Sequence, residues 1–466
     1  MAKKNKKRGR PTGSRHRAKK YIPHLLKGVK DILPQEQRYY DFIIGKTEEL
    51  ARAYGFDKIT IPILEESDLF KRRVGLTKDI FQKEIFSFED LGGHKISLRP
   101  EGTAGVARAY IQHGLSASLQ PVKLFYHGPM FRYERLEMGK QKEFYQFGLE
   151  IIGSNKPVTD AQLILFVNAL LQGLGIKFTI QINNLGCREC RKIYFKKLTD
   201  FIRQKGRIFC RECRVKIKRN PLKIFECHGK ECHDTLMQAP HIVDYLCEEC
   251  RSQFVRTLEF LDEARVVYNL NPFVVKGAGF NDRTVFEFWP IKTEQPKPVV
   301  ANSTISPEIT QKIQPQPEEV IDSRLAIAAG GRYDQLLHDL GGAIAPACGL
   351  SIGIDRLVDE AKKQQIKTAR VKPIQVFVAQ VSDLARQNAL RIFELIRKEG
   401  YRVGENLAQD SLRTQLDIAN KLGAKYTLVF GQQEVIHKTV IIRDMVSGSQ
   451  ETIDQEKIVR ELRKRL

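Results

Sequence analysis

The sequence predicts an α+β protein built around an antiparallel sheet, with a Cys-rich insertion and a compact α/β domain after it. Two long strand-like runs are joined by a short charged loop, residues 187–250 contain eight of the nine cysteines, and residues 372–466 alternate strand-like and helical patterns. Because a chain of 466 residues is long enough for about three domains, these segments can form separate units.

The first predicted elements are a helix over 34–54 and a strand over 56–64. Apolar residues recur at helical spacing until Gly55, and β-branched residues follow it. The helix is expected to bury the face that carries Tyr39, Phe42, Ile43, Leu50 and Ala53.

The next predicted elements are strands over 122–127 and 144–152, which form an antiparallel hairpin. In the second strand, Gln146 and Glu150 lie on one face and the large apolar residues on the other, because side chains alternate along a strand. Taken alone, this pattern predicts a sheet with one face half exposed to solvent.

The last segment repeats strands and helices at short intervals. Strand patterns over 374–379, 426–430 and 439–442 alternate with a helix capped by Ser382 and are followed by a basic C-terminal helix. This alternation predicts a compact α/β domain.

Changes in pattern divide the chain into five segments. They are a basic tail (1–20), a first part of the sheet domain (21–180), a Cys-rich insertion (181–262), a second part of the sheet domain (263–365) and the α/β domain (372–466). Six of the nineteen prolines lie in 290–320, which we expect to be a disordered insertion in the second part.

Positive charge is concentrated at the N-terminus. The chain has 77 Lys and Arg against 55 Asp and Glu, a net charge of +22, and residues 1–20 contain ten basic residues and no acidic one. We expect this tail to be disordered. It could read a DNA groove through residues 8–11, attract phosphates without sequence preference, or simply be solvated. The overall charge is typical of proteins with a polyanionic partner such as nucleic acid.

No apolar run approaches the ~20 residues of a membrane-spanning helix, and no apolar segment follows the basic N-terminus as in a secretory signal. The sequence therefore predicts a cytoplasmic protein without a membrane partner.

The cysteines are spaced like metal ligands. They form the pairs Cys187 and Cys190, Cys210 and Cys213, Cys247 and Cys250, and the looser pair Cys227 and Cys232. Two pairs supply the four thiolates of a tetrahedral zinc site, so the segment predicts one or two structural Zn²⁺ ions. Disulfides, unbound thiols and an iron–sulfur cluster are the alternatives, with disulfides disfavoured in the cytoplasm. The nearby histidines 228, 233 and 241 are possible substitute ligands.

Four separated segments each place an arginine beside other polar groups: 99–103, 132–135, 330–334 and 353–356. One such segment alone predicts only a surface salt bridge. Together they suit a site that binds a triphosphate through guanidinium groups and the ammonium group of an amino acid through carboxylates.

These segments resemble, in order and spacing, the signatures of histidyl-tRNA synthetases, a family of class II aminoacyl-tRNA synthetases. The matching motifs are Lys30–Pro34, Leu98–Thr103, Phe131–Arg135, Glu143–Glu150, Gly330–Asp334 and Gly353–Arg356. The resemblance runs from about residue 26 to the C-terminus. It implies that the antiparallel sheet is the catalytic domain, that the C-terminal α/β domain binds an anticodon, and that the protein is a homodimer with Pro62 at its interface.

The resemblance also implies roles for individual residues. Arg132 would hold the α-phosphate of ATP and Arg356 the γ-phosphate, with Glu134 near the adenine. Glu101 and Thr103 would bind the histidine ammonium group. The expected reaction joins L-histidine and Mg²⁺-bound ATP to histidyl-adenylate and then transfers histidine to the 3′ end of tRNA(His). The implied histidine-binding residues are Glu101, Thr103, Gln146, Glu150, Asn281 and Tyr333, with Glu150 reading the imidazole.

The chain departs from the family pattern at 276–281. Where the family has Arg-Gly-Leu-Asp-Tyr-Tyr, this chain has Lys-Gly-Ala-Gly-Phe-Asn. Lys276 takes the place of a catalytic arginine and lacks its two-pronged guanidinium, and Asn281 takes the place of a tyrosine that contacts the imidazole. After Arg135, Leu136 and Glu137 replace Pro-Gln, and Lys140 and Lys142 replace two arginines. We expect a remodelled amino-acid pocket and an altered contact with the tRNA acceptor end.

Two functions compete on this evidence. An active histidine–tRNA ligase is favoured by the retained site residues and by the anticodon-binding domain. A non-catalytic synthetase-like regulatory subunit of ATP phosphoribosyltransferase is favoured by the altered segment at Lys276. A zinc-bearing DNA-binding protein would account for the basic tail and the cysteines, but for none of the motifs between them.

Overall fold

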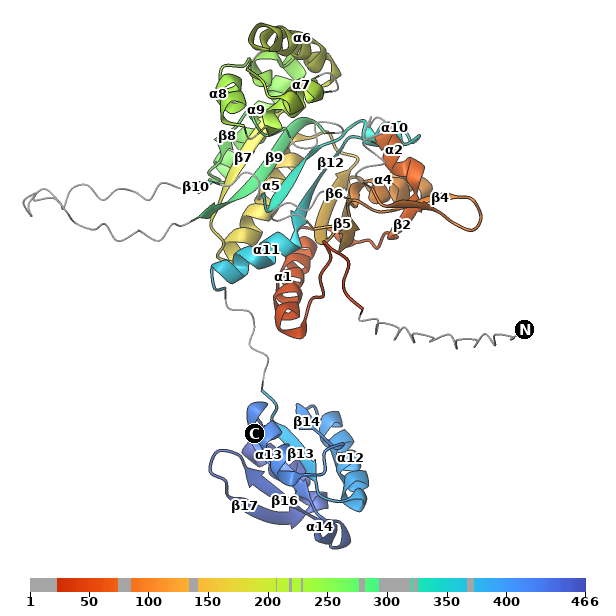
Figure 1. Ribbon diagram of the computed structural model, residues 1–466, viewed down its shortest axis with the longest axis vertical. Helices are drawn as coiled ribbons and strands as arrows, with labels where there is room; N and C mark the ends of the chain where they lie inside the picture. Colours follow the sequence, from red (N-terminus) through yellow and green to blue (C-terminus); the bar gives the residue numbers. More distant parts are fainter. Residues whose placement is uncertain are drawn as a thin grey trace, which may run out of the picture. The chain divides into compact units, whose positions relative to one another are not determined.

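The computed structural model describes residues 23–73, 85–133, 141–206, 208–217, 220–227, 229–275, 281–292, 320–321, 326–366 and 373–466. The chain divides into two compact units, Met1–Thr368 and Ala369–Leu466 (Figure 1). The basic tail, Glu134, Lys276 and most of the Pro-rich segment lie outside the described residues.

A mixed sheet forms the centre of the first unit. Its strands are β1 (Asp57–Lys58), β5 (Val122–Phe131), β6 (Glu143–Ile152), β7 (Phe178–Asn184), β8 (Asn269–Leu270), β9 (Asp282–Lys292), β10 (Val320–Ile321), β11 (Ala328–Arg332) and β12 (Ala347–Gly353). The order is β1-β5-β6-β12-β11-β9-β7-β8, and β10 pairs with β9. Pairing is antiparallel throughout the middle of the sheet and parallel where β1 and β8 join its edges. The predicted hairpin of β5 and β6 is confirmed.

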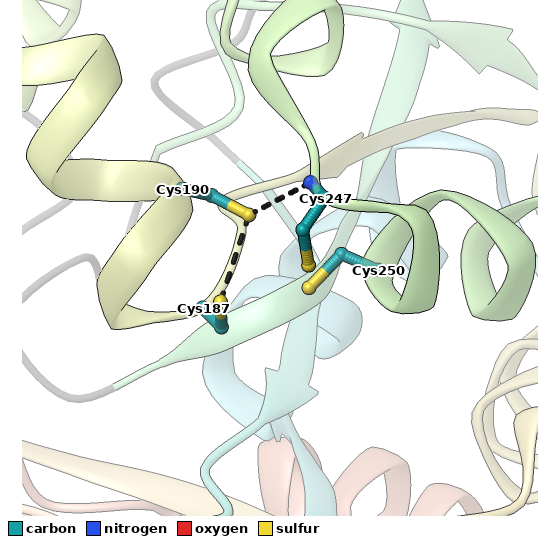
Figure 2. A group of neighbouring side chains, drawn as sticks. All are labelled: Cys187, Cys190, Cys247 and Cys250. Atoms are coloured by element: carbon teal, nitrogen blue, oxygen red, sulfur yellow. Dashed lines mark hydrogen bonds between the residues drawn. The ribbon is translucent and has the colours of Figure 1, made fainter.

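The Cys-rich insertion is a group of helices between β7 and β8. They are α6 (Arg188–Lys205), α7 (Arg211–Ile217), α8 (Lys230–Leu236), α9 (Glu248–Glu263) and the short 3₁₀ helices η2 (Pro221–Glu226) and η3 (Ile242–Tyr245). Buried residues of this group, among them Tyr194 and Leu236, share one apolar cluster with Val285 and Trp289 of β9. The insertion is therefore packed onto the sheet, and the starts of α6 and α9 bring four cysteines together (Figure 2).

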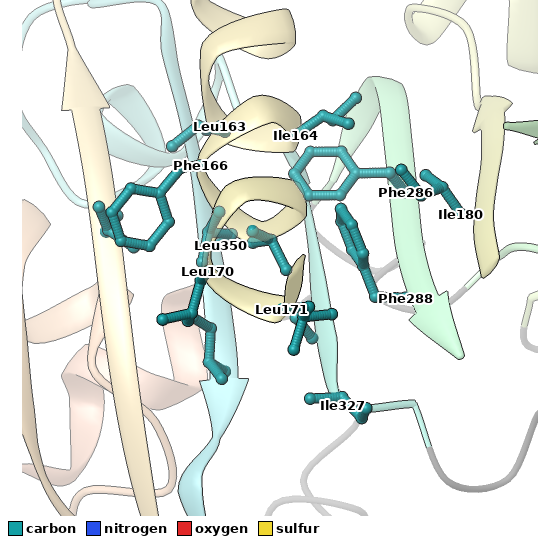
Figure 3. Close-up of a cluster of buried hydrophobic side chains, with 14 of the residues drawn as sticks. Leu163, Ile164, Phe166, Leu170, Leu171, Ile180, Phe286, Phe288, Ile327 and Leu350 are labelled. Carbon is teal, nitrogen blue, oxygen red and sulfur yellow. The ribbon is translucent and has the colours of Figure 1, made fainter. Parts of the chain in front are cut away.

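Helices cover the apolar face of the sheet. They are α1 (Pro34–Ala53), α5 (Pro157–Gly173), α9 and α11 (Ile354–Lys363). Figure 3 shows Phe166 and Leu170 of α5 in the same buried cluster as Phe286 and Phe288 of β9. Because alternate residues of each strand point to this layer, the remaining residues of the same strands project from the opposite face, where the site lies.

Smaller elements cover one end of that opposite face. They are a three-stranded sheet of order β2-β4-β3 and the helices around it: β2 (Leu64–Glu66), β3 (Ser87–Glu89), β4 (Lys95–Leu98), α2 (Ser67–Arg73), α4 (Thr103–Gln112), α10 (Leu336–Asp339) and η1 (Leu115–Ala117). Val106 and Tyr110 of α4 share a buried cluster with Tyr126 and Met130 of β5 and Leu336 of α10.

The second unit is an α/β domain, as predicted. Its sheet has the order β14-β13-β15-β16-β17, with parallel pairing around β13 and antiparallel pairing from β15 to β17. The Ser382 side chain accepts a hydrogen bond from the Ala385 N–H and caps the first helix. The elements are β13 (Val376–Gln380), α12 (Asp383–Lys398), β14 (Val403–Glu405), α13 (Leu412–Lys421), β15 (Tyr426–Phe430), α14 (Gln432–Ile436), β16 (Thr439–Asp444), β17 (Gln450–Asp454), η5 (Gln455–Lys457) and α15 (Ile458–Arg465).

Two predicted boundaries are wrong. Residues 56–64 do not form one strand, because Pro62 has no N–H to pair and the carbonyl oxygens of Ile61 and Pro62 accept from the Arg99 guanidinium at 2.8 and 3.5 Å. The Pro-rich segment at 290–320 was expected to be disordered throughout, but β9 continues to Lys292 and β10 begins at Val320.

None of the helices in the described part of the chain is long and apolar enough to cross a lipid bilayer.

Candidate active site and metal clusters

A buried carboxylate lies at the centre of the candidate site. Glu150 of β6 is 1% exposed and accepts hydrogen bonds from the hydroxyl of Tyr126, at 3.2 Å, and from the hydroxyl of Tyr333. Burial and the neighbouring carboxylate raise the pKa of Tyr333 well above its usual value, so this phenol stays protonated and donates. The prediction of a half-solvated polar face is wrong, because Gln146 is buried as well.

Glycines make room for this arrangement. Gly349 of β12 pairs with Glu150 of β6, and a methyl group at Gly349 would overlap the Glu150 carboxylate. A methyl group at Gly102 or Gly148 would overlap the Tyr126 ring. The positions of Glu150 and Tyr126 therefore depend on the absence of side chains at these three residues.

Gln146 lies on the same face of β6 as Glu150. It pairs with Gly128 of β5 and with Gly353 of β12, and residues paired in antiparallel strands project to the same side. Neither neighbour carries a side chain of its own, and the Arg99 guanidinium occupies the space over Gly128, where a methyl group would lie 2.6 Å from it.

Glu101 and Thr103 lie where α4 begins. The Glu101 carboxylate accepts from the backbone N–H of Thr103 at 2.7 Å and of Ala104 at 3.1 Å. These bonds satisfy free N–H groups of the helix terminus and fix the orientation of the carboxylate, and the Tyr126 ring packs on the adjacent Gly102.

Arg132 and Arg356 are partly accessible arginines at the edges of this face. The Arg132 side chain donates from Nε to the Pro100 carbonyl at 2.9 Å, and its guanidinium lies 5.0 Å from the centre of the Phe144 ring. Arg356, in the first turn of α11, donates to the Ala326 carbonyl at 2.8 Å. Each arginine is oriented by a backbone oxygen and is only partly buried.

Arg99 and Arg332 have a different role. Arg332 is 1% exposed and is held by Asp160 of α5 at 3.1 Å, by Asp334 at 3.1 Å and by the Ser154 carbonyl at 2.6 Å. Arg99 is buried against backbone carbonyls. Of the four arginine segments in the sequence, two therefore place a buried arginine that holds the scaffold, and Arg132 and Arg356 are the candidates left for the expected triphosphate site.

Asn281 is buried immediately before β9, at the end of the altered segment. Its backbone carbonyl accepts a hydrogen bond from the guanidinium of Arg191 in α6. The following Asp282 is partly buried, and burial together with the nearby Asp334 carboxylate raises its pKa to about 6.

The structure groups the eight cysteines into two sets of four. Cys187, Cys190, Cys247 and Cys250 form the first cluster, and Cys210, Cys213, Cys227 and Cys232 form the second; within each, the sulfur atoms lie within 4.8 Å of one another. In the first cluster the side chains converge from the starts of α6 and α9 (Figure 2).

The geometry of both clusters suits a tetrahedral metal ion. The sulfur atoms of Cys187 and Cys190 are 3.6 Å apart, close to the roughly 3.8 Å edge of a tetrahedron with Zn–S bonds of about 2.3 Å. Backbone N–H groups donate to Cys190 Sγ at 3.1 Å and to Cys210 Sγ at 3.4 Å. The second of these bonds, from Cys213, lowers the pKa of Cys210 to about 7 and so favours the thiolate that a metal requires.

Tyr126 is a site residue that the sequence analysis did not identify. The signal was present in the hairpin register, because a residue of β5 that projects to the face of Glu150 must lie beside it. Arg191 was also missed, because nothing in its local pattern links it to a residue ninety positions later.

A largely antiparallel sheet with this strand order, an insertion between β7 and β8, and a separate α/β unit after it define a class II aminoacyl-tRNA synthetase. The comparisons specify the family. A model described as Histidyl-tRNA synthetase matches residues 28–189, and one described as Anticodon binding domain matches residues 375–465.

Curated relatives match nearly the whole chain. A histidine–tRNA ligase of Thermosipho melanesiensis is 36% identical over 93% of this chain and 97% of its own length, and one of Aquifex aeolicus is 36% identical over 92% and 98%. The crystal structure of apo Staphylococcus aureus histidyl-tRNA synthetase is 28% identical, with a TM-score of 0.72 over 95% of this chain and all of that one. The chain belongs to the histidyl-tRNA synthetase family.

Proposed function

We propose that this chain is a histidine–tRNA ligase in which Glu150 recognises the imidazole of the substrate. The observation that carries the proposal is the buried Glu150 carboxylate, which is oriented by the hydroxyls of Tyr126 and Tyr333. Imidazole offers an N–H donor, and a buried carboxylate that already holds two donors on one side can accept it on the other. An apolar amino acid would leave the carboxylate desolvated and unpaired.

The partly accessible arginines are suited to bind ATP. In the proposed reaction an oxygen of the histidine carboxylate attacks the α-phosphorus, the bond to the β-phosphate breaks, and pyrophosphate leaves with the electron pair. By resemblance we assign Arg132 to the charge at the α-phosphate, Arg356 to the γ-phosphate and Glu134 to the adenine, and the partial exposure of the two arginines supports their assignment. Mg²⁺ enters with ATP as part of the substrate and screens its phosphates. Such a site works through orientation and electrostatics.

Lys276 is assigned the place of the second catalytic arginine. An ammonium group supplies the positive charge that the α-phosphate needs, but it binds one oxygen at a time where guanidinium binds two. We therefore propose that Lys276 supports adenylation, with Asn281 replacing a tyrosine in the pocket.

The test is histidine-dependent exchange of pyrophosphate into ATP. We expect exchange with the unaltered chain and a loss of about 100-fold or more in Lys276→Ala, while Lys276→Arg retains activity. The absence of exchange with every amino acid, in a folded protein that still binds histidine, would instead support the regulatory function.

The cysteine clusters support a proposal of two structural Zn²⁺ ions, held by Cys187, Cys190, Cys247 and Cys250 and by Cys210, Cys213, Cys227 and Cys232. In the described part of the chain, no hydrogen bond found for these cysteines joins them to a proposed site residue. Bound zinc would fix the starts of α6 and α9 and the small helices of the insertion. We also propose a cytoplasmic location, where the thiols would stay reduced and available to a metal.

We further propose a homodimer, with residues 21–180 and 263–365 as its catalytic domain and 181–262 as the insertion. Exposed apolar side chains near Pro62 support an interface there, among them Ile63, Leu64 and Phe88, which are 42%, 48% and 49% exposed. The second unit and the basic tail would contact tRNA(His).

A further inference from the structure

Arg191 joins two parts of the chain that lie far apart in sequence. It follows Cys190 in the first turn of α6, and its Nε donates to the Leu185 carbonyl at 2.9 Å. The same guanidinium donates to the Asn281 carbonyl. Since Leu185 follows β7 and Asn281 precedes β9, the Arg191 side chain connects the end of β7 to the start of the neighbouring strand β9.

Part of the first cysteine cluster lies in the same helical turn as Arg191. Cys187 is the N-cap of α6, and the Arg191 N–H donates to the Cys187 carbonyl at 3.0 Å. Two ligands of the first cluster therefore lie within four residues of Arg191, in the same helical turn. A metal ion that fixes these two cysteines would therefore also fix the backbone of Arg191.

The other half of the cluster holds the other side of the same segment. Arg283 adopts a positive φ of 53° and donates to Glu249 of α9 at 2.9 Å and to Gln253 of α9. Cys247 is the N-cap of α9. Both helices that supply thiolates to the first cluster thus hydrogen-bond to residues 281–283. The contact from α6 is made by Arg191, and the contact with α9 is made by Arg283.

We propose that Arg191 is a positioning residue that transmits the geometry of the first cysteine cluster to the histidine-binding segment. The proposal rests on the proposed function, in which Asn281 belongs to the amino-acid site. Arg191 does not touch the substrate. It holds the backbone from which the Asn281 side chain projects, so its loss lowers affinity for histidine and leaves the ATP site on Arg132 and Arg356 unchanged.

The matched control is Lys192, the next residue of α6. Its side chain is 71% exposed and pairs with Glu189 at 2.7 Å. Lys192→Met removes one positive charge from the same helical turn without touching residues 281–283.

The experiment compares Arg191→Met, Arg191→Lys and Lys192→Met by zinc content, calorimetric histidine affinity, and KM for histidine and ATP in pyrophosphate exchange. Arg191→Met should weaken histidine binding about tenfold or more, since it removes charged hydrogen bonds. Arg191→Lys should recover part of this loss, and the KM for ATP and the zinc content should not change. Amide hydrogens of 281–285 should exchange faster with solvent in Arg191→Met and not in Lys192→Met.

Histidine affinity within twofold of the unaltered chain, or an equal loss for ATP and histidine, would overturn the proposal. A failure of the proposed function is a separate result, namely no pyrophosphate exchange in the unaltered chain. Histidine calorimetry and amide exchange do not depend on turnover, so they decide the role of Arg191 in that case as well.

Discussion

The Tyr333 hydroxyl donates a hydrogen bond to the Glu150 carboxylate across the strand that separates them. Glu150 lies on β6, Tyr333 follows β11, and β12 runs between the two. The contact is possible because the β12 residue opposite Glu150 is Gly349, which has no side chain. The position of the carboxylate that we propose as the histidine-recognition group thus depends on three neighbouring strands.

Replacing the carboxylate tests this recognition directly. Glu150→Gln keeps the shape of the side chain but removes the charge, and the KM for histidine in pyrophosphate exchange should rise about 10- to 100-fold. Tyr333→Phe removes one donor and should cost less. If Glu150→Gln binds histidine as well as the unaltered chain, another group reads the imidazole.

Gly349→Ala tests the space between the strands. The added methyl group would overlap the Glu150 carboxylate and lie 2.7 Å from the Leu149 carbonyl oxygen, so the carboxylate must move. We expect a rise in KM for histidine and a loss of about 1–3 kcal/mol in stability, measured by denaturant unfolding. Gly45→Ala in α1 is the control, because a methyl group there meets nothing within 4 Å. Equal behaviour of the two variants would show that Glu150 is not confined by β12.

Metal content tests the two clusters separately. Elemental analysis of protein purified without added zinc should give about two equivalents per chain. Cys187→Ser with Cys190→Ser should remove one, and Cys210→Ser with Cys213→Ser the other. Less than half an equivalent in the unaltered chain would contradict the zinc proposal.

Asp282 predicts a pH dependence of stability. Its pKa is about 6 in the folded protein, against about 4 in the unfolded chain, so the folded state binds the proton more tightly. The contribution of this group to stability is therefore present below pH 4 and is lost as the pH rises through 6. The Tm of Asp282→Asn, relative to the unaltered chain, should rise by a few degrees between pH 4 and pH 7. A constant difference would mean that the carboxyl group is not perturbed by burial.

Local patterns in the sequence predicted the local structure well. The hairpin of β5 and β6 and the cap at Ser382 depend on neighbouring residues, so periodicity and capping chemistry suffice to find them. The same holds for the cysteine pairs, whose spacing is that of metal ligands. The grouping of the pairs depends on the path of the chain, which brings Cys247 next to Cys190 rather than to the nearer pairs.

Burial of polar groups could not be predicted from the sequence, because distant partners provide it. Glu150 is buried by Tyr126, which lies on β5, and by Tyr333, which follows β11. In α1, the expected inward face included Tyr39, but Tyr40 is the buried residue, and its hydroxyl donates to Asp355 of α11. A pattern of apolar residues locates a helix face only to within a residue when the helix also carries a buried polar contact.

Charging of tRNA(His) with labelled histidine tests the central claim most directly. The purified chain, with ATP, Mg²⁺ and histidine, should form histidyl-tRNA from tRNA(His) and not from a tRNA of another specificity, and Lys276→Ala should slow its formation about 100-fold or more. A folded chain that binds histidine and tRNA but forms no histidyl-tRNA would contradict the account and identify the site as one that binds histidine without activating it.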